Sequence, residues 1–214
     1  MKFELPKDHG LSGAIVANLV FREDEKPALT DAQFEALRAG VGRGDSALVY
    51  PGRLDAPRAK WVFSRLEAGL RSPRTEEPVP LALDSLDIDH VLPTSWLEHW
   101  PLPDGAKASA ADINASILAS YSDQPLSVRH ASIRRRESAK AKIGNLTLLH
   151  YGVNRGLQNH GFDRKREALF AESNLQLNRE LMRLDSWDED AIESRGRNLF
   201  EVARQLWQCS AEPR

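Results

Sequence analysis

An aspartate followed directly by a histidine is the feature of this sequence best suited to chemistry. Asp89 and His90 lie in the stretch Asp87-Ile88-Asp89-His90-Val91-Leu92-Pro93, at the end of a short apolar run. A carboxylate is a good ligand for a divalent metal ion, and a histidine with an ordinary pKa of about 6.5 is largely neutral at cellular pH and can accept a proton from water. The pair therefore predicts a hydrolytic centre in which Asp89 holds the metal ion and His90 acts as general base.

Two short strands are expected to position this pair. Residues 81–89 alternate in polarity near their end and lead into His90, and residues 146–149 form a second short apolar run after a glycine turn. Adjacent side chains on a strand point to opposite faces. Asp89 and His90 can therefore act on the same phosphate group of a substrate only where the backbone bends. The Val91-Leu92-Pro93 exit favours such a bend.

The rest of the chain is expected to be mostly helical. Capping patterns at Thr30, Ser109 and Ser186 predict three helices, and apolar spacing after Pro57 and a basic run from Phe162 to Ala171 predict two more. Residues 72–80, rich in proline and acid, are expected to be a linker. The positions assigned to core packing are Val62, Phe63, Leu66, Leu70, Ile192, Leu199, Val202 and Leu206. Phe34 and Leu37 are the apolar residues of the helix after Thr30, and Ile113, Ile117, Leu118 and Tyr121 are expected on one side of the helix after Ser109.

Positive charge is concentrated in one segment, although the whole chain has a formal net charge of -2. Residues 129–166 contain ten basic and two acidic residues, so the segment carries +8 and the rest of the chain carries -10. This asymmetry predicts a local phosphate-binding surface, with a solvated helix face as the alternative for Arg134 to Arg136. The ten basic residues are Arg129, Arg134, Arg135, Arg136, Lys140, Lys142, Arg155, Arg164, Lys165 and Arg166.

Cysteine content and the N-terminal sequence narrow the class of protein. Cys209 is the only cysteine, so neither a disulfide framework nor a structural zinc site is expected. Residues 11–21 are too short for a membrane span and are interrupted by Asn18. A cytoplasmic protein without membrane contact is therefore expected.

In this order and spacing, the motifs resemble those of HNH nucleases, whose catalytic unit is a ββα-metal finger. The closer resemblance is to the C-terminal nuclease domain of GmrSD-like modification-dependent restriction enzymes and to SspE-type phage-defence proteins. It covers about residues 57–182 and rests on Ala59 to Glu67, Ile88 to Pro93, Ile143 to Leu149, Asn154 with Asn159 and Phe162, and Lys165 leading to Leu175-Gln176-Leu177-Asn178-Arg179.

The resemblance implies a role for each residue of the finger. It implies His90 as general base, Asp89 as metal ligand, and Asn145 as the loop asparagine that braces the finger and orients the histidine. Asn154, expected to open the helix after the second strand, resembles a second metal ligand, with a turn or helix cap as the alternative. The implied metal is Mg²⁺ or Mn²⁺.

Other positions are less well matched to the family. The third histidine of its name has no clean counterpart, and His150 and His160 are its candidates. Trp96 and Trp100 are expected to anchor the insertion, with base stacking as the alternative. The expected nucleic-acid contacts, of which Arg155 and Lys165 come from the resemblance, are Arg134, Arg135, Arg136, Lys140, Lys142, Arg155, Arg164 and Lys165.

The predicted fold is α+β, a mostly helical body that holds a small ββα-metal (His-Me) finger. Residues 1–80 are expected to form a helical region packed on the nuclease, residues 81–182 the nuclease core with an insertion at 94–142, and residues 183–214 a C-terminal helix. Asn145 lies 55 positions after His90, and this spacing requires that insertion.

The predicted function is metal-dependent DNA cleavage, one strand at a time, in bacterial restriction or anti-phage defence. In the resembled family a nucleotide-hydrolysing sensor domain precedes the nuclease. No Gly-x-x-x-x-Gly-Lys phosphate loop occurs in this sequence, so that sensor is expected to be missing from it. The alternatives are a noncatalytic nucleic-acid-binding module and an RNA-directed or toxin-like nuclease.

Overall fold

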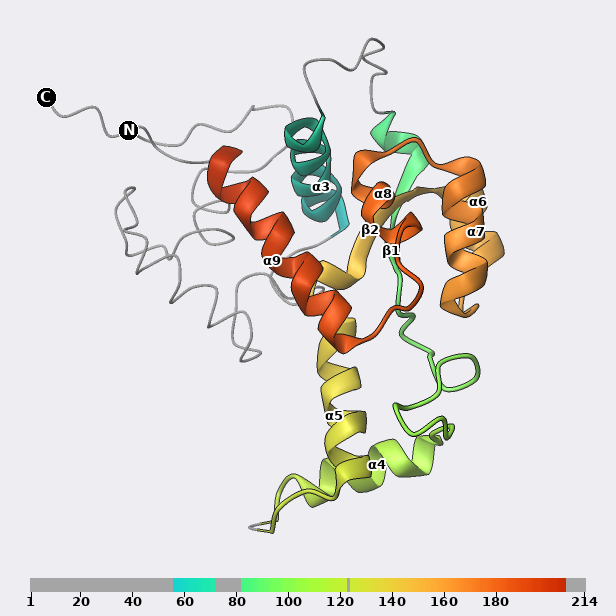
Figure 1. Cartoon of the computed structure of the whole chain (residues 1–214), viewed down its shortest axis with the longest axis vertical. Coiled ribbons are helices and arrows are strands. Elements are labelled where there is room, and N and C mark those ends of the chain that lie inside the picture. The colour runs from blue at the N-terminus through green and yellow to red at the C-terminus, as the bar shows by residue number, and fades with distance from the viewer. Residues whose placement is uncertain (1–55, 72–81, 123, 207–214) are drawn as a thin grey trace, which may run out of the picture.

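The structure, a computed structural model, describes residues 56–71, 82–122 and 124–206. Over these ranges the chain is mostly helical around one small antiparallel sheet (Figure 1), which confirms the expected α+β class. The elements in chain order are α3 (Ala56–Leu70), η2 (Leu83–Ser85), β1 (Leu86–His90), α4 (Ala110–Ala119), α5 (Val128–Lys140), η3 (Ile143–Asn145), β2 (Leu146–His150), α6 (Tyr151–Leu157), α7 (Phe162–Glu172), α8 (Gln176–Met182) and α9 (Glu189–Leu206), where η marks a short 3₁₀ helix.

The sheet pairs two strands that lie far apart in the sequence. Asp89 of β1 lies opposite Thr147 of β2, and His90 lies opposite Leu146. The strand expected over residues 81–89 begins only at Leu86, because residues 83–85 form a 3₁₀ turn in which the Ser85 amide and hydroxyl both donate to a backbone carbonyl. The second strand lies where the sequence predicts it, with one further residue at its end.

Helices cover the sheet on both faces, and the hydrophobic core lies between the helices and the strands. Figure 1 shows α3 and α9 on one side of the strands and α6 and α7 on the other. The helix expected after Pro57 is confirmed, and its residues Val62, Phe63 and Leu66 are buried, whereas Leu70 at its end is 36% exposed. Because helices cover both faces, the apolar residues of β2 are fully buried, as expected of a strand that reads as a continuous apolar run.

Glu67, a fully buried acid on α3, ties that helix to α8. Its Oε1 accepts hydrogen bonds from the Gln176 amide at 3.1 Å and from Arg71 Nε at 2.9 Å, and its Oε2 accepts one from the Leu177 amide at 2.9 Å. The first amides of a helix have no partner within the helix, and a carboxylate both bonds them and balances the helix dipole. Glu67 therefore fixes the start of α8 against the core.

The insertion forms an arm that projects from the body (Figure 1). Its two helices, α4 and α5, pack against each other, and the predicted capping box of Ser109 and Asp112 at the start of α4 is confirmed. Of the apolar residues predicted on one side of this helix, Ile113 and Ile117 are half-buried, whereas Leu118 and Tyr121 are 73% and 84% exposed. The two-helix arm is too thin to cover every apolar position of α4.

The C-terminal helix starts later than predicted. The expected cap at Ser186 is wrong: α9 begins at Glu189, and the Asp188 carboxylate accepts the Ala191 amide at 2.8 Å. Trp187 lies in the core instead, with its ring 5.9 Å from that of Phe162 and nearly parallel to it. The predicted inward positions Ile192 and Leu199 are buried and Val202 is half-buried, whereas Leu206 is 37% exposed.

Some predictions lie outside the described residues. They concern the helix after Thr30, the linker at residues 72–80, and Cys209. None of the described helices combines the length and the apolar character that crossing a membrane would need.

Candidate active site

The end of β1 brings Asp89 and His90 to the centre of the described molecule. Asp89 is 8% exposed and His90 is half-buried. Lys165, which lies on α7 and is 1% exposed, places its Nζ 3.0 Å and 3.3 Å from the two carboxylate oxygens of Asp89. The same Nζ donates to the backbone carbonyl of His90 at 2.6 Å. One ammonium group thus holds both residues of the predicted pair.

Burial shifts the protonation of this cluster. Removal from water raises the pKa of the Asp89 carboxyl and lowers that of the Lys165 ammonium, against their mutual attraction. Burial, together with the positive charges of Lys165 and Lys140, lowers the pKa of His90 to about 4. The imidazole is therefore neutral over the whole range from pH 5 to 8, which is the form that can accept a proton.

Asn145 fastens the loop that follows this pair. Its Oδ1 accepts the Leu92 amide at 2.7 Å, and its Nδ2 donates to the carbonyls of Leu92 at 2.8 Å and Lys140 at 3.0 Å. Its backbone carbonyl accepts the Val91 amide at 2.9 Å. Oδ1 also accepts Trp187 Nε1 at 3.1 Å, so the fully buried Asn145 joins the loop after β1, the end of α5 and the segment before α9. These hydrogen bonds of Asn145 fix the chain after His90, where the proposed chemistry requires a bend.

The start of α9 supports the Asn145 loop through residues that the sequence reading missed. A Cβ on Gly144 would lie 2.0 Å from the Ile192 carbonyl oxygen and 2.7 Å from the Gly196 nitrogen, so only glycine fits there. Arg195, fully buried, donates through Nη1 to the carbonyls of Gly144 at 2.6 Å and Leu146 at 2.7 Å. The signal available in the sequence was Gly196, since a glycine inside a helix weakens it and often marks close packing.

Asn154 lies on α6, the helix that leaves β2 directly and packs against both strands. It is the fourth residue of α6 and not the opening residue, so neither a helix cap nor a turn accounts for it. The opening position belongs to His150, whose Nδ1 accepts the Gly152 amide at 3.2 Å and whose ring stacks on Tyr151. Asn154 is half-buried, and its side chain makes no hydrogen bond within the described part of the protein.

His160 follows α6 and is exposed beside another histidine. Its ring centroid lies 5.7 Å from that of His99, and its carbonyl accepts Trp100 Nε1 at 3.2 Å. His150 caps a helix and His160 lies in a loop between α6 and α7, so neither is among the residues that bond Asp89 or Asn145.

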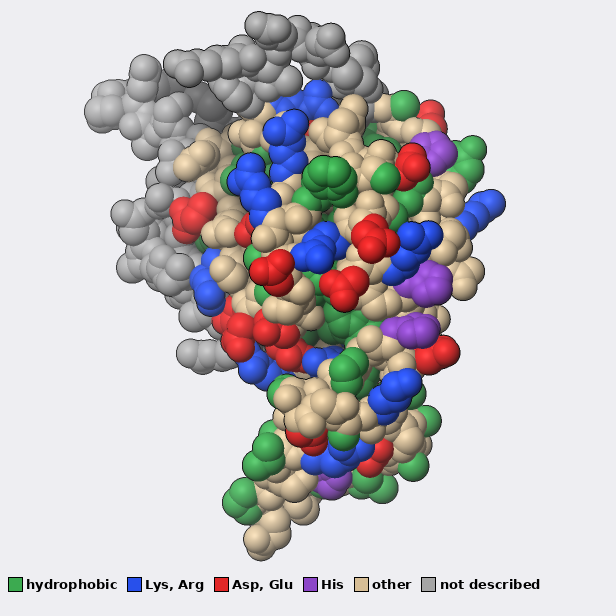
Figure 2. All heavy atoms as spheres, turned by 45° about the vertical axis from the view of Figure 1, so that its right-hand side comes forward, with side chains coloured by type: hydrophobic (Ala, Val, Ile, Leu, Met, Phe, Trp, Pro, Cys, Tyr) green, Lys and Arg blue, Asp and Glu red, His purple; other side chains and the backbone are tan. Residues whose placement is uncertain are grey.

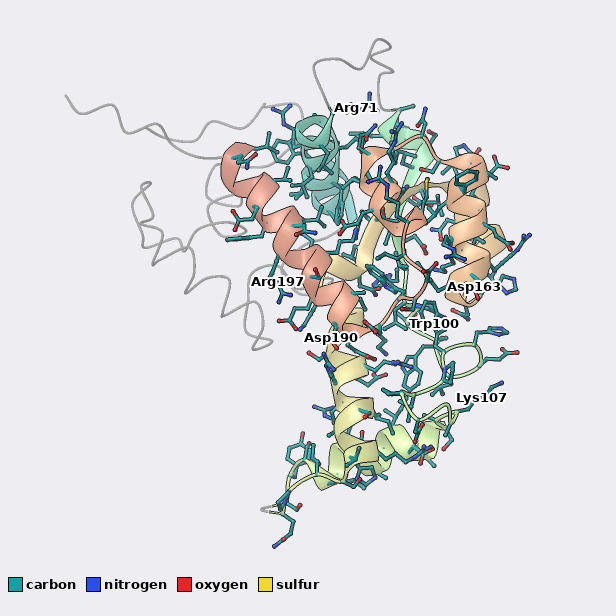
Figure 3. The ribbon with its side chains drawn as sticks, viewed as in Figure 1. Arg71, Trp100, Lys107, Asp163, Asp190 and Arg197 are labelled. Atoms are coloured by element: carbon teal, nitrogen blue, oxygen red, sulfur yellow. The ribbon has the colours of Figure 1, made fainter. Side chains whose placement is uncertain are left out.

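Trp96 and Trp100 anchor the insertion, as expected. Trp96 is 1% exposed and donates through Nε1 to Glu137 at 2.7 Å, and Trp100 is 5% exposed. Figure 3 shows Trp100 where the arm meets the body. Both rings are too deeply buried to stack on an extruded base as they stand.

Arg136 is a core residue and not a surface cation. It is 4% exposed, its Nη1 donates to the carbonyls of Trp100 at 2.8 Å and Pro101 at 2.7 Å, and its guanidinium lies 5.0 Å above the Trp96 ring. The expected phosphate contact therefore does not suit Arg136. The same correction applies to Lys165, whose ammonium is turned inward to Asp89.

Acids from other segments neutralise much of the remaining basic segment. Three basic residues in the last turns of α5 and just after it form ion pairs with acids in the first turns of α9. Figure 3 shows Asp190 at the end of α9 that faces α5. The pairs are Arg135 with Asp190, Arg136 with Glu189, and Lys142 with Glu193 at 3.8 Å. In the same way Arg129 pairs with Asp112 at 3.1 Å and Arg166 with Asp185 at 3.1 Å. Figure 2 accordingly shows basic side chains interspersed with acidic ones.

A smaller set of predicted contacts does reach the surface. Arg134 is exposed and has no ion-pair partner among the residues described. Arg155 is exposed with its guanidinium 5.6 Å above the Tyr151 ring, and Arg164 is exposed beside Glu167 at 3.3 Å. Lys140 is half-buried, lies 2.8 Å from Glu137, and is close enough to His90 to lower its pKa.

The donor atoms at the end of β1 suit a hard divalent cation. The Asp89 carboxylate offers about four lone-pair sites, and the Lys165 ammonium occupies one on each oxygen, so acceptor sites remain on the carboxylate beside the ammonium. Oxygen ligands of this kind are those that Mg²⁺ and Mn²⁺ prefer. No three His, Cys, Asp or Glu side chains gather into a possible metal site in residues 56–71, 82–122 and 124–206, so a site here would need neutral ligands such as the Asn154 amide.

Comparison with known proteins identifies the family of the chain. Residues 47–202, more than half of the chain, match the family described as GmrSD restriction endonucleases, C-terminal domain. The matched range contains β1, β2 and α6, and with them Asp89, His90, Asn145 and Asn154. No curated protein and no solved structure matches the chain.

Proposed function

Because the chain belongs to the family of GmrSD restriction endonuclease C-terminal domains, which makes it a nuclease of the restriction-endonuclease type, we propose that it is an HNH-type, metal-dependent DNA endonuclease. Each active site hydrolyses one phosphodiester bond, so a single chain nicks one strand at a time. The observation that carries the proposal is the joint fixation of Asp89 and His90 at the end of β1 by Asn145 and Lys165.

In the proposed reaction His90 is the general base. Its neutral imidazole takes a proton from a water molecule while the water oxygen attacks phosphorus, and the bond from phosphorus to the 3′ oxygen breaks. The departing 3′ oxygen takes a proton from solvent water, so the products are a 5′ phosphate and a 3′ hydroxyl. General-base assistance of this kind typically contributes about 100-fold to 10,000-fold in rate. Asn145 is a positioning residue, because it is fully buried and its side chain bonds the backbone of Leu92, two residues after His90.

Asp89 and Asn154 are the residues proposed to hold the divalent ion. Asp89 supplies the negative charge, and Asn154 supplies a neutral oxygen from the helix that packs on both strands. When bound, Mg²⁺ or Mn²⁺ would neutralise charge on the phosphate and on the departing oxygen. The deep position of Asp89 keeps the carboxylate in one orientation, which favours a defined site over a diffuse one.

The proposed DNA contacts are the exposed cations Arg134, Arg155 and Arg164, with Lys140 beside the catalytic histidine. Arg135 and Lys142 are weaker members of the set, because each is paired with an acid of α9. Surface ion pairs of this type contribute little energy, so a phosphate can compete for their cations. Binding is proposed to be through the DNA backbone and therefore sensitive to salt.

The biological setting is also a proposal. We place the chain as the effector of a bacterial restriction or anti-phage system in the cytoplasm, with a nucleotide-dependent sensor domain that recognises the modified DNA. The family to which the chain belongs supports the restriction setting. The sensor would supply the sequence or modification preference that a backbone-cutting site lacks.

One substrate comparison tests the proposal. Purified protein is incubated with supercoiled plasmid, single-stranded DNA and structured RNA, each with Mg²⁺, Mn²⁺ or a chelator. We expect conversion of supercoiled plasmid to the open-circular form with metal, and none with chelator. Faster cleavage of RNA would favour the RNA-directed alternative. Plasmid binding without cleavage under any metal would favour a noncatalytic binding module.

A further inference from the structure

We propose that Lys165 is a positioning residue of the catalytic centre, and that its ammonium sets the orientation of Asp89 relative to His90. This inference rests on the proposed function and adds a residue to it. The side chain reaches neither the solvent nor a phosphate bound at the surface, because it is 1% exposed. Its role must therefore pass through the groups that it bonds.

Within residues 56–71, 82–122 and 124–206, Lys165 Nζ makes polar contacts only to the two residues of the predicted pair. Nζ lies 3.0 Å from Asp89 Oδ2, 3.3 Å from Asp89 Oδ1 and 2.6 Å from the His90 carbonyl oxygen. An ammonium has three hydrogens to donate, and these three acceptors use them. The clamp thus spans the side chain of one residue and the backbone of the next.

That arrangement solves the geometric problem of an Asp-His pair on a strand. Successive side chains of a strand point to opposite faces, so nothing in a regular strand fixes them relative to one substrate. Lys165 ties the Asp89 carboxylate to the peptide group that carries His90. Asn145 holds the next peptides through Leu92. Lys165 and Asn145 together fix residues 89–92, one at each end of this segment.

The position of Lys165 is itself well determined. It lies one turn into α7, and its amide donates to the Gly161 carbonyl at 3.2 Å. Phe162 at the start of α7 packs between Trp100 and Trp187, with ring centroids 6.5 Å and 5.9 Å away. Leu169, one turn further on, is buried in the same core. A lysine on so well packed a helix can hold a carboxylate in one orientation.

The competing explanation is that Lys165 only neutralises a buried carboxylate. A buried charge left without its partner is strongly destabilising, whereas removal of both partners together is often tolerated. That explanation predicts a loss of folding alone. Positioning predicts in addition that folded protein lacking the ammonium binds metal more weakly, because partners that orient a metal ligand typically contribute about 10-fold to 100-fold in affinity or activity.

The test compares Lys165→Met and Lys165→Gln with the full-length parent chain. Lys60→Met is the matched control, because Lys60 forms a 3.0 Å ion pair with Asp87 on the same strand but at a more exposed place. Circular dichroism and thermal unfolding report folding. Calorimetric titration with Mn²⁺ reports metal affinity independently of activity, and plasmid nicking over a Mn²⁺ series separates the metal requirement from the rate at saturation.

We expect folded Lys165→Gln and Lys165→Met to bind Mn²⁺ about 10-fold to 100-fold more weakly than the parent and to nick more slowly even at saturating Mn²⁺. Lys60→Met should match the parent in both. Parent-like affinity and rate in a folded variant would overturn the proposal, and so would tighter Mn²⁺ binding with an unchanged rate. If both single variants unfold while Asp89→Asn with Lys165→Met folds, Lys165 serves only to neutralise charge. Failure of the parent itself to bind Mn²⁺ or to nick would instead count against the proposed function.

Discussion

Asn145 bonds both polar backbone atoms of Leu92, a residue 53 positions earlier in the chain. Its Oδ1 lies 2.7 Å from the Leu92 amide nitrogen and its Nδ2 lies 2.8 Å from the Leu92 carbonyl oxygen. This pairing imitates a strand partner just after β1 ends, where the chain leaves the sheet. It keeps the backbone that follows His90 beside the start of β2, although the insertion separates these two segments in the sequence.

Asn145→Ala should therefore destabilise the protein and slow nicking. The change leaves the Leu92 amide, the Leu92 and Lys140 carbonyls and the Trp187 indole without this partner in the interior. Each buried group left unpaired costs about 1–3 kcal/mol, and partial relaxation makes about 3 kcal/mol a reasonable total. Urea unfolding measures the loss. Asn198→Ala, which removes an exposed amide bonded to Glu180, should change stability by less than about 0.5 kcal/mol.

Gly144→Ala tests the packing of α9 on the Asn145 loop. The added Cβ would meet the Ile192 carbonyl oxygen at 2.0 Å, and this neighbour is backbone that cannot rotate away. We expect a loss of about 3 kcal/mol or more in the free energy of unfolding. The control is Gly156→Ala on α6, where the new methyl group meets nothing within 4 Å. That change should be neutral or stabilise by about 0.5–1 kcal/mol, and equal losses in both variants would contradict the packing described.

The parts of the fold that depend on local sequence were predictable. The Ser109 capping box, the helix after Pro57 and the strand after Asn145 lie where spacing and cap residues place them. The sequence-based predictions are wrong where tertiary contacts determine where an element begins. Trp187 was assigned to a helix start, but its ring is needed in the core and its indole bonds Asn145, so the helix begins after it.

The sequence indicates candidate residues for the site but not the contacts that connect them. Asp89, His90 and Asn145 follow from motif order, and the structure brings them together. The charge of residues 129–166 was a poorer guide, because the acids that neutralise Arg135 and Arg136 come from α9, more than 50 residues away. No local pattern reveals a partner at that distance. Lys165 was assigned to a surface for the same reason, since Asp89 lies 76 positions earlier.

DNA binding should depend on the exposed cations and not on total charge. Arg134→Gln should weaken binding and lower the slope of log affinity against log salt concentration by about 0.9, as expected for one lost phosphate contact. Fluorescence anisotropy with duplex DNA over a salt series measures the slope. Arg197→Gln on α9 removes another exposed cation, which pairs with Glu193 at 3.3 Å, and it should leave the slope unchanged. Equal slopes for the parent and Arg134→Gln would remove Arg134 from the interface.

The lowered pKa of His90 has a consequence for stability. The pKa is about 4 in the folded protein and 6.5 in an ordinary histidine. Between these values the unfolded chain binds a proton that the folded chain does not, so His90 makes the free energy of unfolding decrease as pH falls from 6.5 to 4. His90→Gln lacks this contribution. In chelator, the parent should lose stability relative to His90→Gln over that interval, with a constant difference above pH 7. Parallel curves down to pH 4 would contradict the burial of the neutral imidazole.

The most direct test of the account is the nicking rate of His90→Ala on supercoiled plasmid in Mn²⁺, measured beside its DNA affinity. We expect a loss of about 100-fold or more in rate with duplex affinity unchanged, because the imidazole moves a proton and does not hold the DNA. Nicking at the parent rate by the folded variant would contradict it, and the hydrolytic centre at the end of β1 would have to be abandoned.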